Sequence, residues 1–77
     1  MSRIEPVRSF SSKEVRDIRI SVNLTQIAFA AVLGVSKKTV EAWECGRNTP
    51  SGSACRLLSM MEKDPDFLEK YGFVESE

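Results

Sequence analysis

The middle of the chain carries two pairs of helix-starting and helix-ending residues in close succession. They are Thr25 and Gly34, followed by Ser36 and Gly46. Hydroxyl side chains cap helices by accepting hydrogen bonds from first-turn amides, and glycine ends them because it adopts a positive φ without steric cost. This spacing predicts two short helices, residues 26–33 and 37–45, joined by a tight turn.

Three more helices are predicted around this pair. Their starting signals are the capping box of Ser11 and Glu14, the Pro50–Ser51 pair and the Asp64–Pro65 pair. The first of them is expected to run to about Ser21, and the last to cover residues 66–71. No stretch alternates apolar and polar residues with a period of two, so the prediction is an all-α fold of five helices.

A length of 77 residues predicts a single domain. Residues 1–9 show no periodicity and hold Pro6, so we expect a flexible or extended arm there and the domain over residues 10–77. A domain this small buries only about 60% of the surface of its unfolded chain. Its core is therefore expected to be small, which favours completion by a second copy.

Composition excludes most enzyme chemistries. The chain holds no histidine, so it has no histidine metal site, proton shuttle or Ser-His-Asp triad. Cys45 and Cys55 are too few for a disulfide framework, match no zinc spacing, and are interpreted as reduced packing residues. A cysteine enzyme would need one of them to be reactive, so we expect no enzyme, no cofactor and no metal.

The sequence also lacks a membrane signal. No apolar run approaches the roughly 18 residues of a membrane span, and Met1 leads into Arg3 and Glu5 without a signal-peptide core. We therefore expect a soluble cytoplasmic protein with no membrane partner.

The net charge is zero, yet the charges are unevenly distributed. Residues 1–50 carry eight basic and five acidic side chains, whereas residues 51–77 carry three basic and six acidic ones. The isoelectric point near 6.3 lies below the value above about 9 that is typical of basic DNA-binding domains. The basic part still offers a surface that attracts phosphate, and weak binding by one copy makes dimerisation necessary.

Two short helices joined by a glycine-containing turn are the helix-turn-helix signature, in which the second helix enters the major groove of DNA. Residues 24–50 read LTQIAFAAVLGVSKKTVEAWECGRNTP. This segment resembles the phage-repressor and Cro (XRE-type) helix-turn-helix family in its Thr-Gln, Leu-Gly-Val-Ser, Thr-Val and Trp-Glu steps. The motif itself spans residues 25–46.

The flanking residues are most similar to those of HigA-type antitoxins. The similarity lies in the short arm, the SSKEV helix opening and the tail PSGSACRLLSMMEKDPDFLEKYGF. It implies a transcriptional regulator, an autorepressor that binds a palindromic operator in double-stranded DNA as a homodimer. The alternative is an antitoxin of a type II toxin-antitoxin module, which also neutralises a small basic RelE/HigB-like ribonuclease toxin by direct binding.

Lys37 and Lys38 are the predicted base-reading residues. They lie in the first turn of the second motif helix, where the positive end of the helix dipole disfavours cations by roughly 0.3 to 1 kcal/mol each. DNA phosphates remove that penalty, and lysine donates to guanine O6 and N7, whereas the alternative is two solvated lysines. By resemblance, Ala42 also reads bases, through a thymine methyl group. Glu41 either accepts from cytosine N4 or orients Lys37 or Lys38 one turn back, and the alternative is a solvated acid beside the DNA.

The remaining DNA contacts are predicted to go to the phosphate backbone and to fix the register. By resemblance, the positioning residues are Gln26, Ser36, Thr39 and Arg47, with Asn48 as a weaker candidate. Ser36 is also explained as a helix cap worth about 1 kcal/mol without DNA. Arg3 and Arg8 on the arm are interpreted as solvated, with DNA contact as the alternative.

Apolar positions at helical spacing predict the core of the motif. They are Phe29, Ala30, Leu33, Val35, Val40 and Trp43. By resemblance, Arg19 and Glu44 form a partly buried salt bridge between the first and third helices. Ile27, Ala28 and Ala31 give the second helix an apolar outer face, which is either incidental or a contact for a partner protein.

The C-terminal segment is densely apolar. Its apolar residues are Phe67, Leu68, Tyr71, Phe73 and Val74. One face of this segment is expected to cover the core of its own chain, and the exposed remainder is the expected seam of a two-fold dimer.

Overall fold

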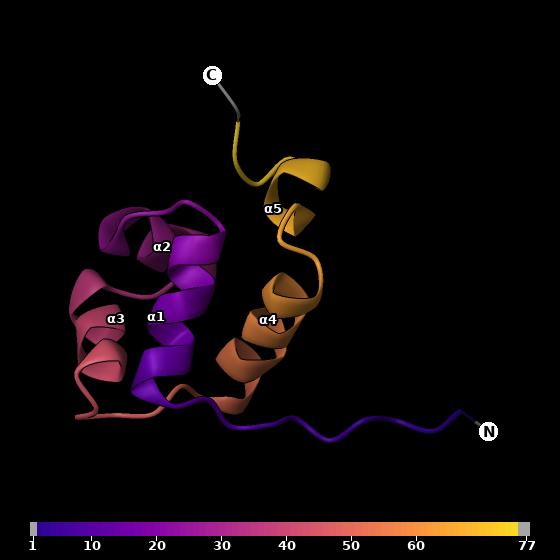
Figure 1. The fold of residues 1–77 in the computed structure, drawn as a ribbon, viewed down its shortest axis with the longest axis horizontal. Helices are drawn as coiled ribbons and strands as arrows, with labels where there is room; N and C mark the ends of the chain where they lie inside the picture. Colours follow the sequence, from indigo (N-terminus) through magenta and orange to yellow (C-terminus); the bar gives the residue numbers. More distant parts are fainter. Residues whose placement is uncertain (1, 76–77) are drawn as a thin grey trace.

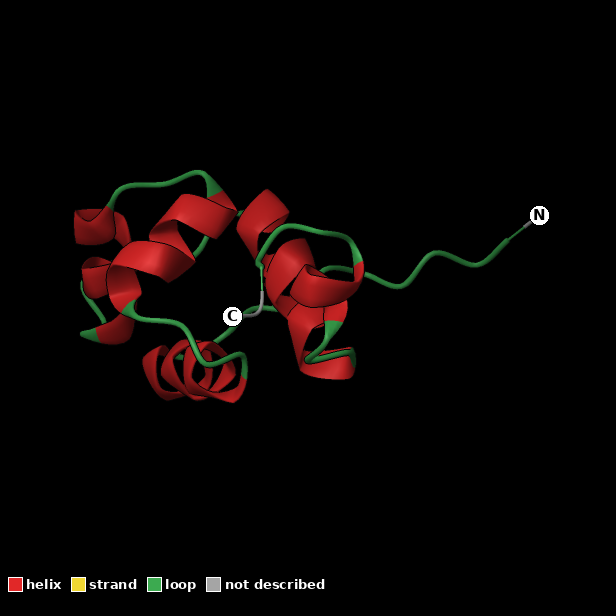
Figure 2. Cartoon of the chain, turned by 90° about the horizontal axis from the view of Figure 1, so that it is seen from above, coloured by secondary structure: helices red, strands yellow, loops and turns green. Residues whose placement is uncertain are grey.

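The computed structural model describes residues 2–75 and confirms the predicted all-α fold. Within this range the chain forms no strand and five helices, α1 (Ser12–Ser21), α2 (Gln26–Leu33), α3 (Lys37–Glu44), α4 (Gly52–Lys63) and α5 (Phe67–Lys70). α1 packs against both α3 and α4, and it lies between them in Figure 1. Seen from above, the helices surround a common centre and the N-terminal arm extends away from them (Figure 2).

The core takes side chains from all five helices, with Leu68 from α5, and from Phe10 just before α1. Its largest fully buried members are Val15, Phe29, Val40, Leu58 and Met61. The predicted motif core is confirmed at Ala30 and Trp43 as well, whereas Leu33 and Val35 are half-buried and pack against its edge. These buried contacts, which combine residues from distant parts of the sequence, hold the two short motif helices in place.

Local capping fixes where the first four helices begin, as predicted. Ser11 and Glu14 form the capping box, with the Ser11 amide donating to Glu14 Oε1 at 2.9 Å and the Glu14 amide donating to Ser11 Oγ at 3.2 Å. Thr25, Ser36 and Ser51 each accept from the amide three residues on, at 3.1, 3.1 and 3.4 Å. Each cap satisfies an amide that has no partner within its own helix.

The start of α5 corrects the prediction that Asp64 caps a helix beginning at Pro65. The Asp64 carboxylate instead accepts from the Asp66 amide at 3.3 Å and from Lys70 Nζ at 2.8 Å. The Asp64 carbonyl accepts from the Phe67 amide at 3.0 Å, so residues 64–67 form a turn that precedes the helix. The helix therefore begins only at Phe67, one turn long, and Asp66 at its N-cap makes no capping bond through its side chain.

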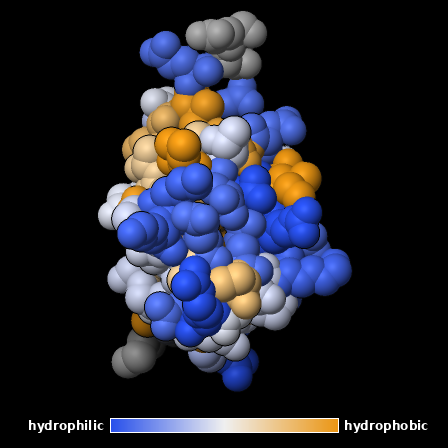
Figure 3. Space-filling model, turned by 90° about the vertical axis from the view of Figure 1, so that its left-hand side faces the viewer, coloured by the Kyte–Doolittle hydropathy of each residue, from blue (hydrophilic) through white to orange (hydrophobic). Residues whose placement is uncertain are grey.

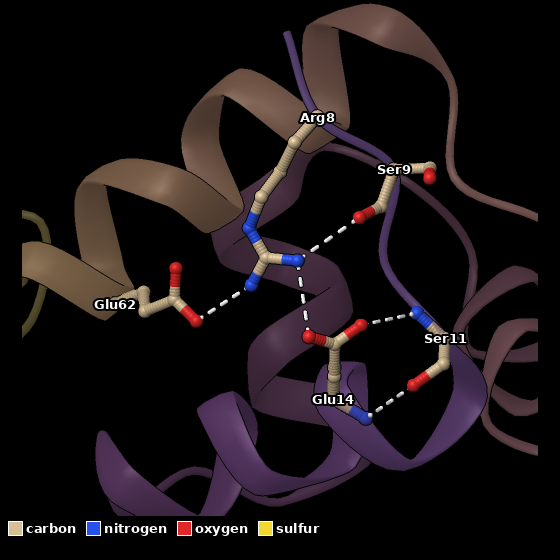
Figure 4. Close-up of polar contacts among 5 residues, drawn as sticks. All are labelled: Arg8, Ser9, Ser11, Glu14 and Glu62. Atoms are coloured by element: carbon tan, nitrogen blue, oxygen red, sulfur yellow. Dashed lines mark hydrogen bonds and ion pairs between the residues drawn. The ribbon is translucent and has the colours of Figure 1, made fainter.

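Arg8 fastens the arm to the helical body instead of being free in solvent as expected. Its guanidinium donates to Glu14 of α1 at 3.0 Å and to Glu62 of α4 at 2.7 Å, as Figure 4 shows. It also lies over the ring of Phe10, 3.8 Å from the centroid, in a cation–π contact. The sequence interpretation missed this anchor because Glu62 lies 54 residues away along the chain.

A second bond holds the arm nearer to its start. Arg56 of α4 donates to the carbonyl oxygen of Glu5 at 2.9 Å. Toward its N-terminal end the arm runs past α4 and away from α3. The start of the arm and α3 lie at opposite ends of the view in Figure 1. The start of the arm therefore extends away from the helix predicted to enter DNA (Figure 1).

Candidate nucleic-acid interface

The turn between α2 and α3 is a glycine-ended helix terminus of the Schellman type. Gly34 adopts φ 71°, and the amides of Gly34 and Val35 donate to the carbonyls of Ala31 and Ala30 at 3.3 and 3.0 Å. A left-handed residue reverses the chain within one position, which only glycine does without strain. Only three residues, 34–36, therefore separate α2 from α3, and the two helices pack directly against each other.

One face of α3 is buried and the opposite face is exposed. Val40 and Trp43 lie in the core, whereas Lys37, Lys38 and the C-capping residue Cys45 are exposed and Glu41 is half-buried. Lys37, Glu41 and Cys45 follow one another at intervals of four, so they form a row along the outer face. α3 thus presents a polar strip with its two lysines at the N-terminal end.

Ala42 does not belong to this strip. Its side chain is only 9% exposed, at the edge of a hollow that Lys38 and Glu41 also line, and its carbonyl accepts from the amides of Arg47 and Asn48 at 2.9 and 3.3 Å. This burial argues against the predicted contact with a thymine methyl group. Ala42 instead packs α3 onto the domain and ends the helix.

Arg19 and Glu44 confirm the expected salt bridge between α1 and α3. Arg19 Nε and Nη2 donate to Glu44 Oε2 and Oε1 at 2.7 and 3.0 Å, with side chains 16% and 7% exposed. The bond to Glu44 raises the pKa of Arg19 above its ordinary value. The carboxylate also accepts from Gln26 Nε2 at 3.3 Å, so this predicted DNA contact already uses one amide hydrogen within the protein.

The N-terminus of α3 is closed by two hydroxyl groups. Ser36 Oγ accepts from the Thr39 amide at 3.1 Å and shares a hydrogen bond of 2.9 Å with Thr39 Oγ1. The predicted capping role of Ser36 is confirmed, and Thr39 is drawn into the same cap. The contact of either hydroxyl with a phosphate stays a prediction.

The C-terminal end of α3 holds an exposed thiol. The helix ends at Glu44, one residue earlier than predicted, and Arg47 Nε donates to Cys45 Sγ at 3.1 Å. This hydrogen bond lowers the pKa of the Cys45 thiol. The packing interpretation is therefore wrong for Cys45 but correct for Cys55, which is buried. The four-residue interval from Glu41 to Cys45 is a sequence signal for the outer face that the packing interpretation overlooked.

The helix-turn-helix arrangement of this chain is shared with a known protein family. A family model described as helix-turn-helix matches residues 15–60, which cover most of α1, all of α2 and α3, and most of α4. The chain belongs to the helix-turn-helix family of the repressor and Cro (XRE) type. It is a DNA-binding protein of this class, and the family is not one of enzymes.

Two relatives extend this finding. The helix-turn-helix chain is 37% identical to the antitoxin HigA-2 of Vibrio cholerae serotype O1, over 78% of its own length and 58% of the relative. It is 34% identical to YiaG, an uncharacterized HTH-type transcriptional regulator of Escherichia coli K12, over 75% of its own length and 60% of the relative. The chain therefore spans less than two thirds of these curated relatives.

In this helix-turn-helix protein, α3 holds the position of the motif's second helix, which is the recognition helix in such motifs. Figure 3 shows the face on which α2 and α3 lie, with hydrophilic side chains over most of its centre and hydrophobic ones mainly toward the end that carries α2. Of the residues predicted to form the apolar outer face of α2, Ile27 and Ala31 are exposed and Ala28 is half-buried. Among residues 2–75, no helix has both the length and the apolar character needed to cross a membrane.

Proposed function

We propose that this protein is a transcriptional repressor that binds a pseudo-palindromic operator upstream of its own gene as a homodimer. The observation that carries the proposal is the polar outer strip of α3, in which Lys37 and Lys38 are exposed at the N-terminal end and Glu41 is half-buried. Neither lysine has an ion-pair partner within the described range 2–75. Two cations at the positive end of a helix destabilise the free protein, and DNA relieves that cost.

The residues of the strip divide into two roles. Lys37 and Lys38 donate to guanine edges in the major groove, and Glu41, four residues on from Lys37, accepts from cytosine or orients the lysine. Phosphate oxygens are held by Arg47 and, at the helix N-termini, by Gln26 and the Ser36–Thr39 cap. Ala42 has no part in the proposed contacts because it is buried.

The proposed dimer seam lies at α5, where apolar side chains remain uncovered. Phe67 contacts Tyr71 and Phe73 at ring-centroid distances of 5.5 and 6.1 Å, and both of these partners are well exposed. With Met60 they line a hollow of about 540 Å³. Closing two such faces against each other buries the aromatic cluster and leaves both recognition helices free for half-sites about 34 Å apart.

Repression is tested with a reporter gene placed behind the DNA upstream of this gene. Expression of the wild-type protein is expected to lower reporter output, and the double variant Lys37→Ala with Lys38→Ala is expected to restore it. Asp17→Ala on the outer face of α1 is the control and should repress like wild type. Unchanged reporter output with wild-type protein present contradicts the proposal.

A second candidate function is that of an antitoxin, favoured by the similarity to HigA-2 and by exposed Ile27 on α2. In this function the same chain also covers a small basic toxin. Co-expression with a small basic protein encoded beside this gene is the test. A stable complex that Ile27→Asp disrupts supports the antitoxin function, and purification of the two proteins apart from each other contradicts it.

A further inference from the structure

The basic side chains of this protein divide into those bonded within the chain and those that are not. Among residues 2–75, four of them form ion pairs with carboxylates, namely Arg8, Lys13, Arg19 and Lys70. Arg56 is bonded to the carbonyl of Glu5. Arg16 of α1 is exposed and has neither kind of partner in the described part of the chain.

Arg16 lies beside the C-terminal end of the recognition helix. It borders a hollow of about 520 Å³ together with Cys45 and Arg47, which follow α3, and with Gln26 of α2. The Arg19–Glu44 pair also borders this hollow and cancels its own charge. Arg16 and Arg47 then face the single remaining carboxylate of Glu41, so the hollow carries a net positive charge.

This hollow continues into the predicted DNA-binding surface. Glu41 and Arg47 also line a neighbouring hollow of about 390 Å³ that includes Lys38 and Asn48. Cationic side chains thus run from the start of α3, through Arg47, to Arg16 on α1. The chain of hollows has the charge and continuity to follow one strand of a DNA backbone, which carries a negative charge at every phosphate.

We propose that Arg16 is a DNA-positioning residue that binds, together with Arg47, one backbone phosphate beside the C-terminal end of α3. Guanidinium groups suit this role because their planar fork donates two parallel hydrogen bonds to phosphate oxygens. Arg47 uses only its Nε on Cys45, which leaves its terminal amino groups for the phosphate. The inference rests on the proposed function, because it requires α3 to lie in a DNA groove.

The test measures DNA affinity against salt concentration for wild type and for Arg16→Ala, with the operator duplex and a scrambled duplex. Arg16→Ala is expected to lower the affinity for both duplexes by the same factor, about tenfold at low salt. The slope of log affinity against log salt should fall by about one per protomer, and Arg16→Lys should restore it. A merely structural role would leave this slope unchanged.

Lys13→Ala is the matched control, because it removes one positive charge from the same helix. Lys13 is paired with Asp17 at 2.8 Å, and Asp17 lines a separate hollow with Glu14 and Glu62. The salt slope of Lys13→Ala should equal that of wild type. If Arg16 and Arg47 share one phosphate, the variant lacking both side chains should lose less slope than the two single variants together.

The outcomes separate this inference from the function on which it rests. Operator preference by wild type, with an Arg16→Ala slope no different from that of Lys13→Ala, overturns the role of Arg16 alone. Failure of wild type to bind any duplex overturns the repressor proposal itself. If circular dichroism shows that Arg16→Ala is unfolded, the same measurements are made on Arg16→Gln, which keeps more of the length of the side chain.

Discussion

Arg19 and Glu44 join the first helix to the recognition helix by a two-pronged ion pair that is largely shielded from water. The same guanidinium donates to the carbonyl of Leu24 at 3.0 Å, and the same carboxylate accepts from Gln26. The pair therefore connects α1, the loop before α2, the first turn of α2 and the end of α3. It sets the angle at which the recognition helix is presented, without contributing net charge to the surface.

Glu44→Ala is expected to destabilise the domain by about 3 kcal/mol, because Arg19 then keeps its charge in a site shielded from water. Urea denaturation followed by circular dichroism measures the change. Asp17→Ala is the control, since its pair with Lys13 is exposed and its loss should cost far less. Equal losses for the two variants would contradict a structural role for the Arg19–Glu44 pair.

Lys37→Ala and Lys38→Ala are expected to reduce discrimination between operator and scrambled DNA by about 1 to 3 kcal/mol each. The physical reason is that each lysine donates to base edges, which differ between sequences. Arg47→Ala should instead lower the affinity for both duplexes alike and lower the salt slope by about one per protomer, because the Arg47 side chain contacts phosphate. Competition binding gives both quantities, and identical behaviour of all three variants would contradict the division of roles.

Cys45 is expected to react with iodoacetamide faster than Cys55 near neutral pH. The Cys45 thiol is exposed and its pKa is lowered by the hydrogen bond from Arg47, so a larger fraction is thiolate, whereas Cys55 is buried. Arg47→Ala should return the pKa toward its ordinary value and slow the labelling of Cys45. Mass spectrometry of the labelled protein over time follows each site, and an unchanged rate in Arg47→Ala would argue against this hydrogen bond in solution.

Phe73→Asp is expected to shift the protein from dimer to monomer, because it places a charge within the exposed aromatic cluster beside α5. Ile27→Asp is a matched control, since both side chains are 64% exposed and the two differ in the surface to which they belong. Sedimentation equilibrium measures the dissociation constant of each variant. If Ile27→Asp were monomeric and Phe73→Asp were still dimeric, the dimer seam would lie at α2 and not at α5.

The sequence predicted what local chemistry determines. The four helix N-caps and the turn at Gly34 follow from hydroxyl and glycine positions that act within four residues, and the structure has them where they were expected. The Arg19–Glu44 pair was reached only through family resemblance, because 25 residues separate its partners.

The features that were missed depend on the packing of distant segments. Arg8 meets Glu62 only because the arm passes α4, and Ala42 is buried because α3 packs against α1 and α2. At Pro65 the cause is local instead, because the Asp64 carbonyl accepts from the Phe67 amide and a turn forms where Pro65 was expected to start a helix. None of these contacts has a periodic signal in the sequence.

The central claim is sequence-specific binding of duplex DNA through α3. Fluorescence anisotropy tests it most directly, with the labelled duplex from upstream of this gene and a scrambled duplex of equal length, each at several salt concentrations. The account predicts preference for the upstream duplex, two protomers per site, and a salt-dependent affinity for both. Equal affinity for the two duplexes at every salt concentration would contradict it.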